Sequence, residues 1–177
     1  MSPMNATTAS AQDVWDALEH LPDPEIPVVS LRELGILRDV RPGKQGLEVV
    51  ITPTYSGCPA MGQIEDDVRA TLKERGIEAT VVTQLSPAWT TDWISDATRE
   101  KLRAYGIAPP QGNCASQGAN LSVMQFMSRS SIDAPSIACP RCGSTHTVET
   151  SRFGSTACKS LHRCLDCSEP FDYFKPY

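Results

Sequence analysis

Apolar residues recur every three or four positions in three segments of the chain, which predicts three amphipathic helices. The first segment ends at Pro22 and Pro24, the second at Gly76 and the third at Gly106, and these residue types commonly stop a helix. The apolar positions are Val14, Leu18 and Leu21 in the first segment, Met61, Ile64, Val68 and Leu72 in the second, and Ala97, Leu102 and Tyr105 in the third.

Strands are predicted between these helices. A turn followed by a strand is expected within residues 31–40, and alternation over residues 47–51 predicts a strand with one buried face. The intervening sequence, residues 41–46, is typical of a turn, so the two strands should form a hairpin. A third strand is expected at residues 78–85. The order α-ββ-α-β-α predicts an α+β (α/β-type) fold.

Composition divides the chain into three parts. Residues 12–108 hold the α/β domain, and residues 109–137 are rich in Pro, Gly, Ser, Ala and Asn, which is typical of a linker. Residues 138–177 hold five of the seven cysteines and form a second, smaller domain.

The charge balance excludes some functions. The 177 residues carry 16 Lys+Arg against 21 Asp+Glu, a net charge of −5, and no segment has the basic excess of a nucleic-acid-binding protein. No apolar run approaches the ~18 residues that cross a bilayer, and the first residues do not resemble a secretory signal. We therefore expect a cytoplasmic protein with no nucleic-acid or membrane partner.

Four cysteines form two CxxC pairs, Cys139 with Cys142 and Cys164 with Cys167, separated by 21 residues. This spacing is typical of a Cys₄ zinc ribbon, and a domain of this size needs such support because it buries little apolar surface. Iron in a rubredoxin-like site and redox dithiols are the alternatives. Cys158 is a candidate extra ligand, whereas the histidines nearby, His146 and His162, are expected on the surface.

The cysteine at position 58 lies between Gly57 and Pro59, and Pro59 suits the first position of the following helix. A thiol at a helix start is stabilised as thiolate, so Cys58 is a candidate nucleophile or soft-metal ligand with a lowered pKa. The alternative is a buried structural cysteine. A cysteine hydrolase would need His20, the only histidine of this domain, as its partner.

The segment Asp23-Pro24-Glu25 places two carboxylates in a loop stiffened by prolines. Carboxylates bind metals or exchange protons, but Asp23 could equally bond nearby backbone N–H groups in an ordinary turn. Thr54 adds a hydroxyl to the loop before Cys58, where it could support a cluster or serve the turn.

These segments resemble a known family. The motifs DPEIP (23–27), TPTYSGCP (52–59) and PAWTTDW (87–93) are similar to those of the small domain used in cytosolic iron–sulfur protein maturation. Together with REKLRAYGIAPP (99–110), the ribbon, FGSTACK (153–159) and EPFDYFK (169–175), they resemble the PaaD family of phenylacetate degradation.

The resemblance implies a non-catalytic factor that assembles or inserts the iron–sulfur cluster of the multicomponent phenylacetyl-CoA epoxidase. Cys58 then matches the family's reactive cysteine, and Asp23 and Glu25 match its acidic motif. The implied cofactors are zinc and a transient iron–sulfur cluster, and the implied partners are the epoxidase subunits, above all the iron–sulfur reductase. A homodimer is a further expectation, and a structural adaptor that carries no cluster is the alternative function.

Overall fold

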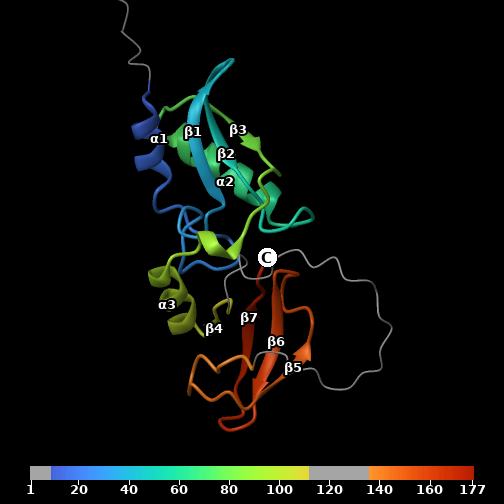
Figure 1. The fold of residues 1–177 in the computed structure, drawn as a ribbon. Coiled ribbons are helices and arrows are strands. Elements are labelled where there is room, and N and C mark those ends of the chain that lie inside the picture. The colour runs from blue at the N-terminus through green and yellow to red at the C-terminus, as the bar shows by residue number, and fades with distance from the viewer. Residues whose placement is uncertain (1–8, 112–135) are drawn as a thin grey trace, which may run out of the picture. The chain divides into compact units, whose positions relative to one another are not determined.

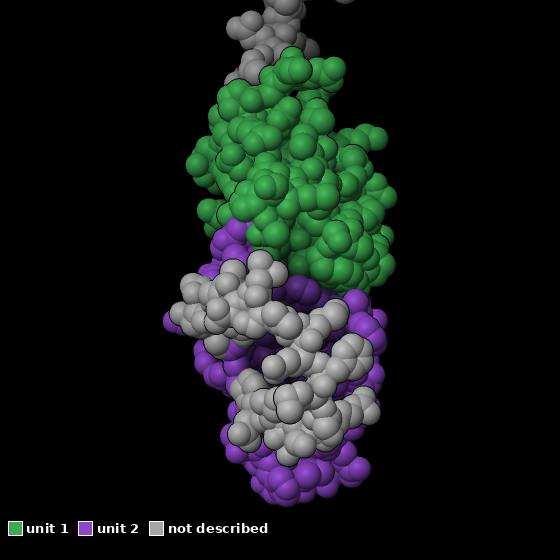
Figure 2. Space-filling view, turned by 45° about the vertical axis from the view of Figure 1, so that its right-hand side comes forward, with its two compact units in different colours: residues 1–89 green, residues 90–177 purple. Residues whose placement is uncertain are grey.

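The computed structural model describes residues 9–111 and 136–177 of the chain. It divides into two compact units, residues 1–89 and residues 90–177, coloured green and purple in Figure 2. Among the described residues, no helix is both long and apolar enough to cross a membrane.

The elements follow the order shown in Figure 1. The first unit contains α1 (Ala11–Leu18), β1 (Leu37–Gly43), β2 (Gly46–Ile51), α2 (Met61–Glu74) and β3 (Ala79–Thr83). The second contains the 3-10 helix η1 (Thr91–Trp93), α3 (Asp96–Tyr105), β4 (Ile107–Ala108), β5 (Thr147–Ser151), β6 (Lys159–Cys164) and β7 (Pro170–Phe174).

The first unit is built on a three-stranded sheet in the order β1-β2-β3. β1 and β2 form the predicted antiparallel hairpin, but β1 continues through Pro42, and Gly43 pairs with Gly46, so the turn is tighter than predicted. Gly46 suits this turn because its φ is +118°, which disfavours residues with a side chain. β3 runs parallel to β2 and is reached through α2, as a parallel pair requires a crossover.

The core of this unit lies between α2 and the sheet. The predicted stripe of Ile64, Val68 and Leu72 is buried on α2. On β2, Val49 and Ile51 are buried as predicted, but Val50 is only 1% exposed as well. The expectation of one buried face is therefore wrong for the end of β2, whose two faces are both covered.

The second unit is built on a four-stranded sheet in the order β4-β7-β6-β5. β5, β6 and β7 are antiparallel neighbours, which is the predicted ribbon hairpin with one more strand. Most of the aromatic tail is core: Phe171, Tyr173 and Phe174 on β7 are buried.

The short strand β4 was not predicted from the sequence. It follows α3 directly and pairs in parallel with β7, Ile107 opposite Asp172 and Ala108 opposite Tyr173. We predicted α3 as the last helix of a first domain that ends at residue 108. The structure instead groups residues 90–108 with the ribbon, because β4 belongs to its sheet. Most of the predicted linker, residues 112–135, lies outside the described residues.

Candidate functional site

The four cysteines of the CxxC pairs meet at one point. The sulfurs of Cys139 and Cys167 are 3.8 Å apart, those of Cys142 and Cys164 are 3.6 Å apart, and all four lie within 4.8 Å of one another. Zinc held tetrahedrally by sulfur at about 2.3 Å separates its ligands by about 3.8 Å. The donor set and its spacing therefore fit a structural zinc ion.

The two pairs lie in turns of the same design. The backbone N–H of Cys139 donates to the carbonyl of Ser144 at 2.8 Å, and that of Cys164 donates to the carbonyl of Glu169 at 2.9 Å. In each turn, the residue after the second cysteine has a positive φ, +76° at Gly143 and +65° at Ser168. Such paired turns bring two thiols each to one ion, as the spacing predicted.

Backbone N–H groups point at the sulfurs. Those of Cys167 and Asp166 donate to the Cys164 sulfur and lower the pKa of that thiol to about 7. At Cys167, the Glu169 N–H acts in the same direction, but partial desolvation and the three neighbouring sulfurs outweigh it and raise the pKa to about 12. Four thiols so close cannot all ionise without a cation, and a divalent ion supplies that charge.

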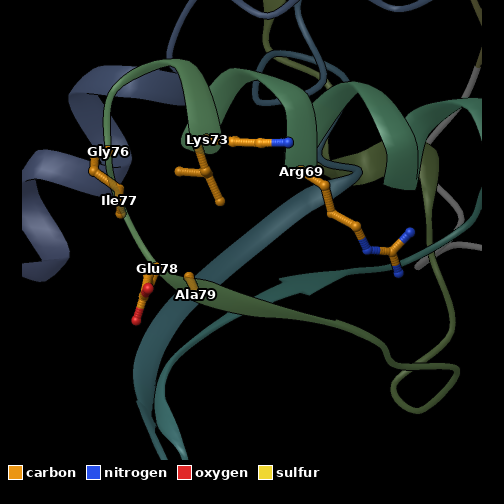
Figure 3. Close-up of a pocket in the computed structure, with 7 residues that line it drawn as sticks. Arg69, Lys73, Gly76, Ile77, Glu78 and Ala79 are labelled. Atoms are coloured by element: carbon orange, nitrogen blue, oxygen red, sulfur yellow. The ribbon is translucent and has the colours of Figure 1, made fainter.

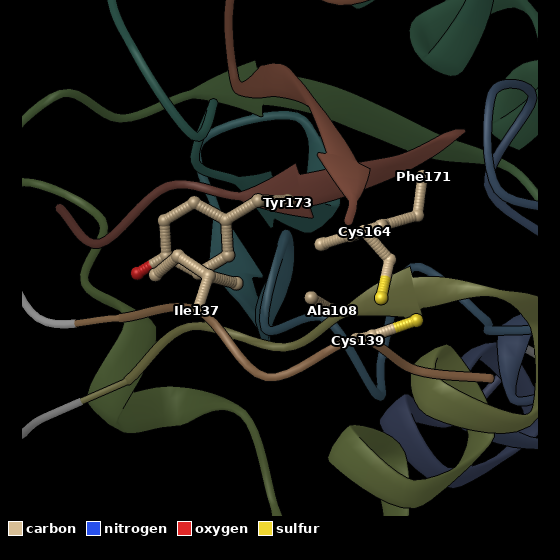
Figure 4. Packing of buried hydrophobic residues seen from close by; sticks show 6 residues of the cluster. All are labelled: Ala108, Ile137, Cys139, Cys164, Phe171 and Tyr173. Atoms are coloured by element: carbon tan, nitrogen blue, oxygen red, sulfur yellow. The ribbon is translucent and has the colours of Figure 1, made fainter. Parts of the chain in front are cut away.

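Two of the four cysteines of the metal site belong to the hydrophobic core of the second unit. Cys139 and Cys164 are buried, whereas Cys142 and Cys167 are exposed. Figure 4 shows the two buried cysteines in a cluster with Ala108, Ile137, Phe171 and Tyr173. Metal binding and core packing are thus coupled in this unit, since the same side chains serve both.

Cys158 is not part of this cluster. Its sulfur lies 3.0 Å from the hydroxyl of Thr156, just before β6, whereas Cys164 ends that strand. Six residues of extended chain span about 20 Å, so the candidate extra ligand is too far from the ion.

The expectation for His162 is also wrong, because its ring is buried and stacks on Phe171. His146 is exposed as expected.

Cys58 lies in the loop before α2, and its side chain is half-buried. The helix begins at Met61 with Ala60 at its N-cap, so Cys58 precedes the cap rather than occupying it. Its N–H donates to the carbonyl of Tyr55 at 3.2 Å, and its carbonyl accepts from Met61 N–H at 3.4 Å. The thiol is held by a tight turn beside the helix rather than inside its first turn.

The pKa of Cys58 is raised, which contradicts the prediction of a lowered value. Burial is the largest cause, and the carboxylates of Glu25 and Asp23 add to it because they repel a thiolate. The backbone of Ala60 and the hydroxyl of Thr54 donate hydrogen bonds that act in the opposite direction but do not prevail. The structure therefore brings all four sequence candidates of this loop region together.

Asp23 shapes the loop that carries these carboxylates. It is buried, and its Oδ1 accepts hydrogen bonds from the N–H groups of Glu25 at 2.9 Å and Ile26 at 2.8 Å. This is the turn that the alternative interpretation of Asp23 predicted. Within the described ranges, the four ribbon cysteines are the only group of three or more Cys, His, Asp or Glu side chains close enough to share a metal.

A cavity of about 390 Å³ lies near the far end of α2 from Cys58 (Figure 3). It is lined by Arg69, Leu72 and Lys73 of α2 and by residues 76–79 of the chain that follows. Arg69 is already paired with Glu65 at 2.8 Å. The cavity contains none of the candidate site residues that the sequence suggested.

Two polar residues escaped the sequence analysis. Ser144 and Asp166 lie in the two cysteine turns, and their side chains hydrogen-bond to each other. The only signal in the sequence was their nearness to cysteines. The cysteine spacing predicts that the turns face each other, but nothing in it indicates that these two side chains bond across the gap.

Comparisons with known proteins divide the chain in a similar way. Residues 11–84 match the family model described as an iron–sulfur cluster assembly protein, and residues 125–175 match that of the PaaD zinc beta ribbon domain. The chain is 46% identical over 173 residues to a protein of Escherichia coli (strain K12) that is named as a putative subunit of 1,2-phenylacetyl-CoA epoxidase, and the match covers 96% of each chain.

Shorter relatives match only part of the chain. The Fe-S protein maturation auxiliary factor YitW of Bacillus subtilis (strain 168) is 31% identical over 98 residues, which are 55% of this chain and 89% of that protein. A solved domain of unknown function (DUF59) from Bacillus anthracis is 28% identical, with a TM-score of 0.47 over 52% of this chain and 90% of that one.

Proposed function

The chain belongs to the PaaD family of iron–sulfur cluster assembly proteins, and from this premise we propose that it builds or inserts the iron–sulfur cluster of a phenylacetyl-CoA epoxidase. Its partners are the epoxidase subunits, with the iron–sulfur reductase subunit as the client. The similarity to a protein named as an epoxidase subunit and to Fe-S maturation factors supports this assignment.

Cys58 is the residue that handles iron or the cluster. The observation that carries this role is that Thr54, Asp23 and Glu25 all act on a single half-buried thiol, Thr54 through a hydrogen bond and the two carboxylates through their charge. Burial, and to a lesser extent the neighbouring carboxylates, keep the thiol protonated in the free protein, and the carboxylates favour an arriving cation. When iron displaces the proton, the charge that opposed the thiolate becomes an attraction for the metal.

One thiolate cannot complete the coordination of a cluster, which usually takes about four. The remaining ligands come from the client, a second copy of the chain or a small thiol. Incomplete ligation favours transfer, because few bonds break when the cargo moves on. The cluster is a substrate here and not a resident cofactor.

The ribbon has a different task. Four cysteines fill the tetrahedral positions of zinc, and a site with no open position does not bind substrate. The ion therefore stabilises the fold, and the folded ribbon contacts the client. Neither site provides a catalytic constellation, so the protein acts as an assembly factor rather than an enzyme.

Replacement of Cys58 tests this role. The epoxidase subunits are co-produced with wild-type protein, with Cys58→Ser or with Cys158→Ser, and iron and acid-labile sulfide are measured in the purified reductase subunit. We expect Cys58→Ser to leave most of the client without cluster. Cys158→Ser is the matched control, because it removes a thiol that is not among the four sulfurs of the metal site and that contacts Thr156, and it should leave the content normal. Normal cluster content with Cys58→Ser rules the role out.

A structural adaptor is the second candidate. It is favoured by the lack of a preformed three-ligand site around Cys58 in the described part of the chain. Anaerobic reconstitution with iron and sulfide distinguishes the two functions. A visible absorption band that disappears in Cys58→Ser supports cluster handling, whereas client binding without any such band supports the adaptor.

A further inference from the structure

Three polar residues join the two cysteine turns across the metal site. The hydroxyl of Ser144, in the first turn, donates a hydrogen bond to Oδ2 of Asp166, in the second. Nδ1 of His146 lies 3.0 Å from Oδ1 of the same carboxylate. The N–H of His146 donates to the Ser144 hydroxyl at 3.0 Å, so the group is closed. We call Ser144, His146 and Asp166 the polar clasp.

The clasp residues also hold the sulfurs. The backbone N–H of Ser144 donates to the sulfur of Cys142, and that of Asp166 donates to the sulfur of Cys164. Ser144 and Asp166 thus each contact a sulfur of their own turn through the backbone and the opposite turn through the side chain. A further bond, from the N–H of Leu165 to the carbonyl of His146 at 2.8 Å, ties the same segments.

The clasp lies at the surface. The side chains of His146 and Asp166 are 67% and 56% exposed, so they add little to the core. Exposed pairs of this kind contribute about 0–1 kcal/mol to folding stability in general. Their position is what sets them apart, because a metal ion held by two thiols from each turn leaves only when the turns separate.

We propose that the polar clasp is a positioning network that sets how long the ribbon keeps its metal ion. The clasp ties the two turns together around the bound ion, and its bonds break before the turns can open. The clasp therefore acts on metal exchange more than on folding. This inference concerns the ribbon alone and does not depend on the role of Cys58.

Asp166→Ala tests the clasp directly, because it removes both side-chain arms and keeps the backbone N–H that contacts Cys164. Zinc release from the full chain into an excess of a colorimetric chelator is followed under reducing conditions. Removal of residues that form hydrogen bonds around the metal ligands typically lowers the affinity for the metal by about 10–100-fold. We therefore expect zinc release from Asp166→Ala to be at least about tenfold faster than from wild type.

Glu169→Ala is the matched control. It removes another exposed carboxylate beside the second turn, whereas the bonds of Glu169 to Cys164 and Cys167 come from its backbone. Release from this variant should stay within about twofold of wild type, since exposed charges contribute little. Asp166→Asn keeps an oxygen acceptor for Ser144, and we expect it to restore slow release in large part.

Cobalt substitution separates positioning from loss of a ligand. Asp166→Ala at saturating Co²⁺ should show the same tetrahedral thiolate spectrum as wild type. If Asp166→Ala does not take up cobalt, the release rates of Ser144→Ala and His146→Ala are measured instead, because each of these variants removes only one of the two side-chain contacts of Asp166. Wild-type release rates in Asp166→Ala, or in both single-arm variants, overturn the proposal, as does a rate in Glu169→Ala that matches Asp166→Ala.

Discussion

Cys58 shows how much a single thiol depends on residues that are distant in the sequence. A thiol near a helix start is ordinarily a good thiolate, because N–H groups and the helix dipole stabilise the negative charge. Here burial and two carboxylates from the loop that follows α1 act against that charge and raise the pKa. A free thiolate is therefore less populated at Cys58 than at an ordinary helix start.

We expect Glu25→Gln to lower the pKa of Cys58, because it removes one of the two repelling charges. Glu25 is the better probe, since Asp23 also holds the backbone of the turn through Oδ1. Iodoacetamide alkylation of Cys58, followed by mass spectrometry from pH 6 to pH 10, reports the thiolate fraction. In wild type, the rate should rise only above the ordinary range of a cysteine, and in Glu25→Gln it should rise at lower pH and be a few-fold greater near pH 8.

Glu74→Gln is the control for that experiment, because it removes an equal charge from the exposed end of α2 away from Cys58. Its alkylation profile should follow that of wild type. Identical profiles for Glu25→Gln and wild type would show that the carboxylate does not act on the thiol.

At the scale of the element, the two cysteine turns share one backbone design with different residues. Both need a positive φ after the second cysteine, and Gly143 adopts it without a penalty, whereas Ser168 does not. A side chain at residue 143 would meet no atom within 4 Å, so packing does not require glycine there. The difference between the turns is therefore one of backbone energy.

Ser168→Gly should stabilise the second unit by about 1 kcal/mol, because it relieves a left-handed residue that carries a side chain. For a unit of this size, that corresponds to a rise in Tm of about 4–8 °C. Thermal unfolding of the zinc-loaded protein at fixed free zinc measures it. Gly143→Ser is the mirror-image variant and should lower Tm by a similar amount. A fall in Tm for Ser168→Gly would contradict the argument.

Elements whose formation depends on residues adjacent in the sequence could be predicted. The helical stripe of α2, the β1–β2 hairpin and the CxxC turns each rest on a few adjacent residues, and the structure contains all three. β4 was not predictable, because two residues carry no periodicity and their pairing with β7 joins positions some 65 apart in the chain.

The same distinction applies to the site. The ribbon cysteines follow from their spacing alone, and the structure brings them together. The resemblance to a family singled out Cys58, Asp23 and Glu25 one by one, but their proximity was not predicted, since more than 30 residues separate Cys58 from the two carboxylates. Burial is the main cause of the raised pKa at Cys58 and the two carboxylates add to it, so local reasoning about the helix start gave the wrong direction.

At the scale of the whole molecule, the two units have separate sources of stability. The first buries the apolar face of α2 against its own sheet, with Ile64, Val68 and Leu72 buried. The second places two metal ligands, Cys139 and Cys164, inside its core cluster. Structural zinc contributes about 10–16 kcal/mol of binding free energy that is coupled to folding. The two units should therefore respond differently when metal is removed.

Removal of zinc should unfold the ribbon and leave the first unit folded. Without the ion, four adjacent thiols lose the charge that holds them, and Phe171 and Tyr173 lose the sulfur side of their core. Amide NMR spectra of the full chain, recorded before and after chelation in reducing buffer, measure the effect residue by residue. Signals from β5, β6 and β7 should collapse, those from α2 and β2 should persist, and zinc but not magnesium should restore the ribbon, because thiolates select the softer ion. A ribbon that keeps its dispersed signals once metal analysis finds no zinc would show that the core, and not the ion, holds this unit together.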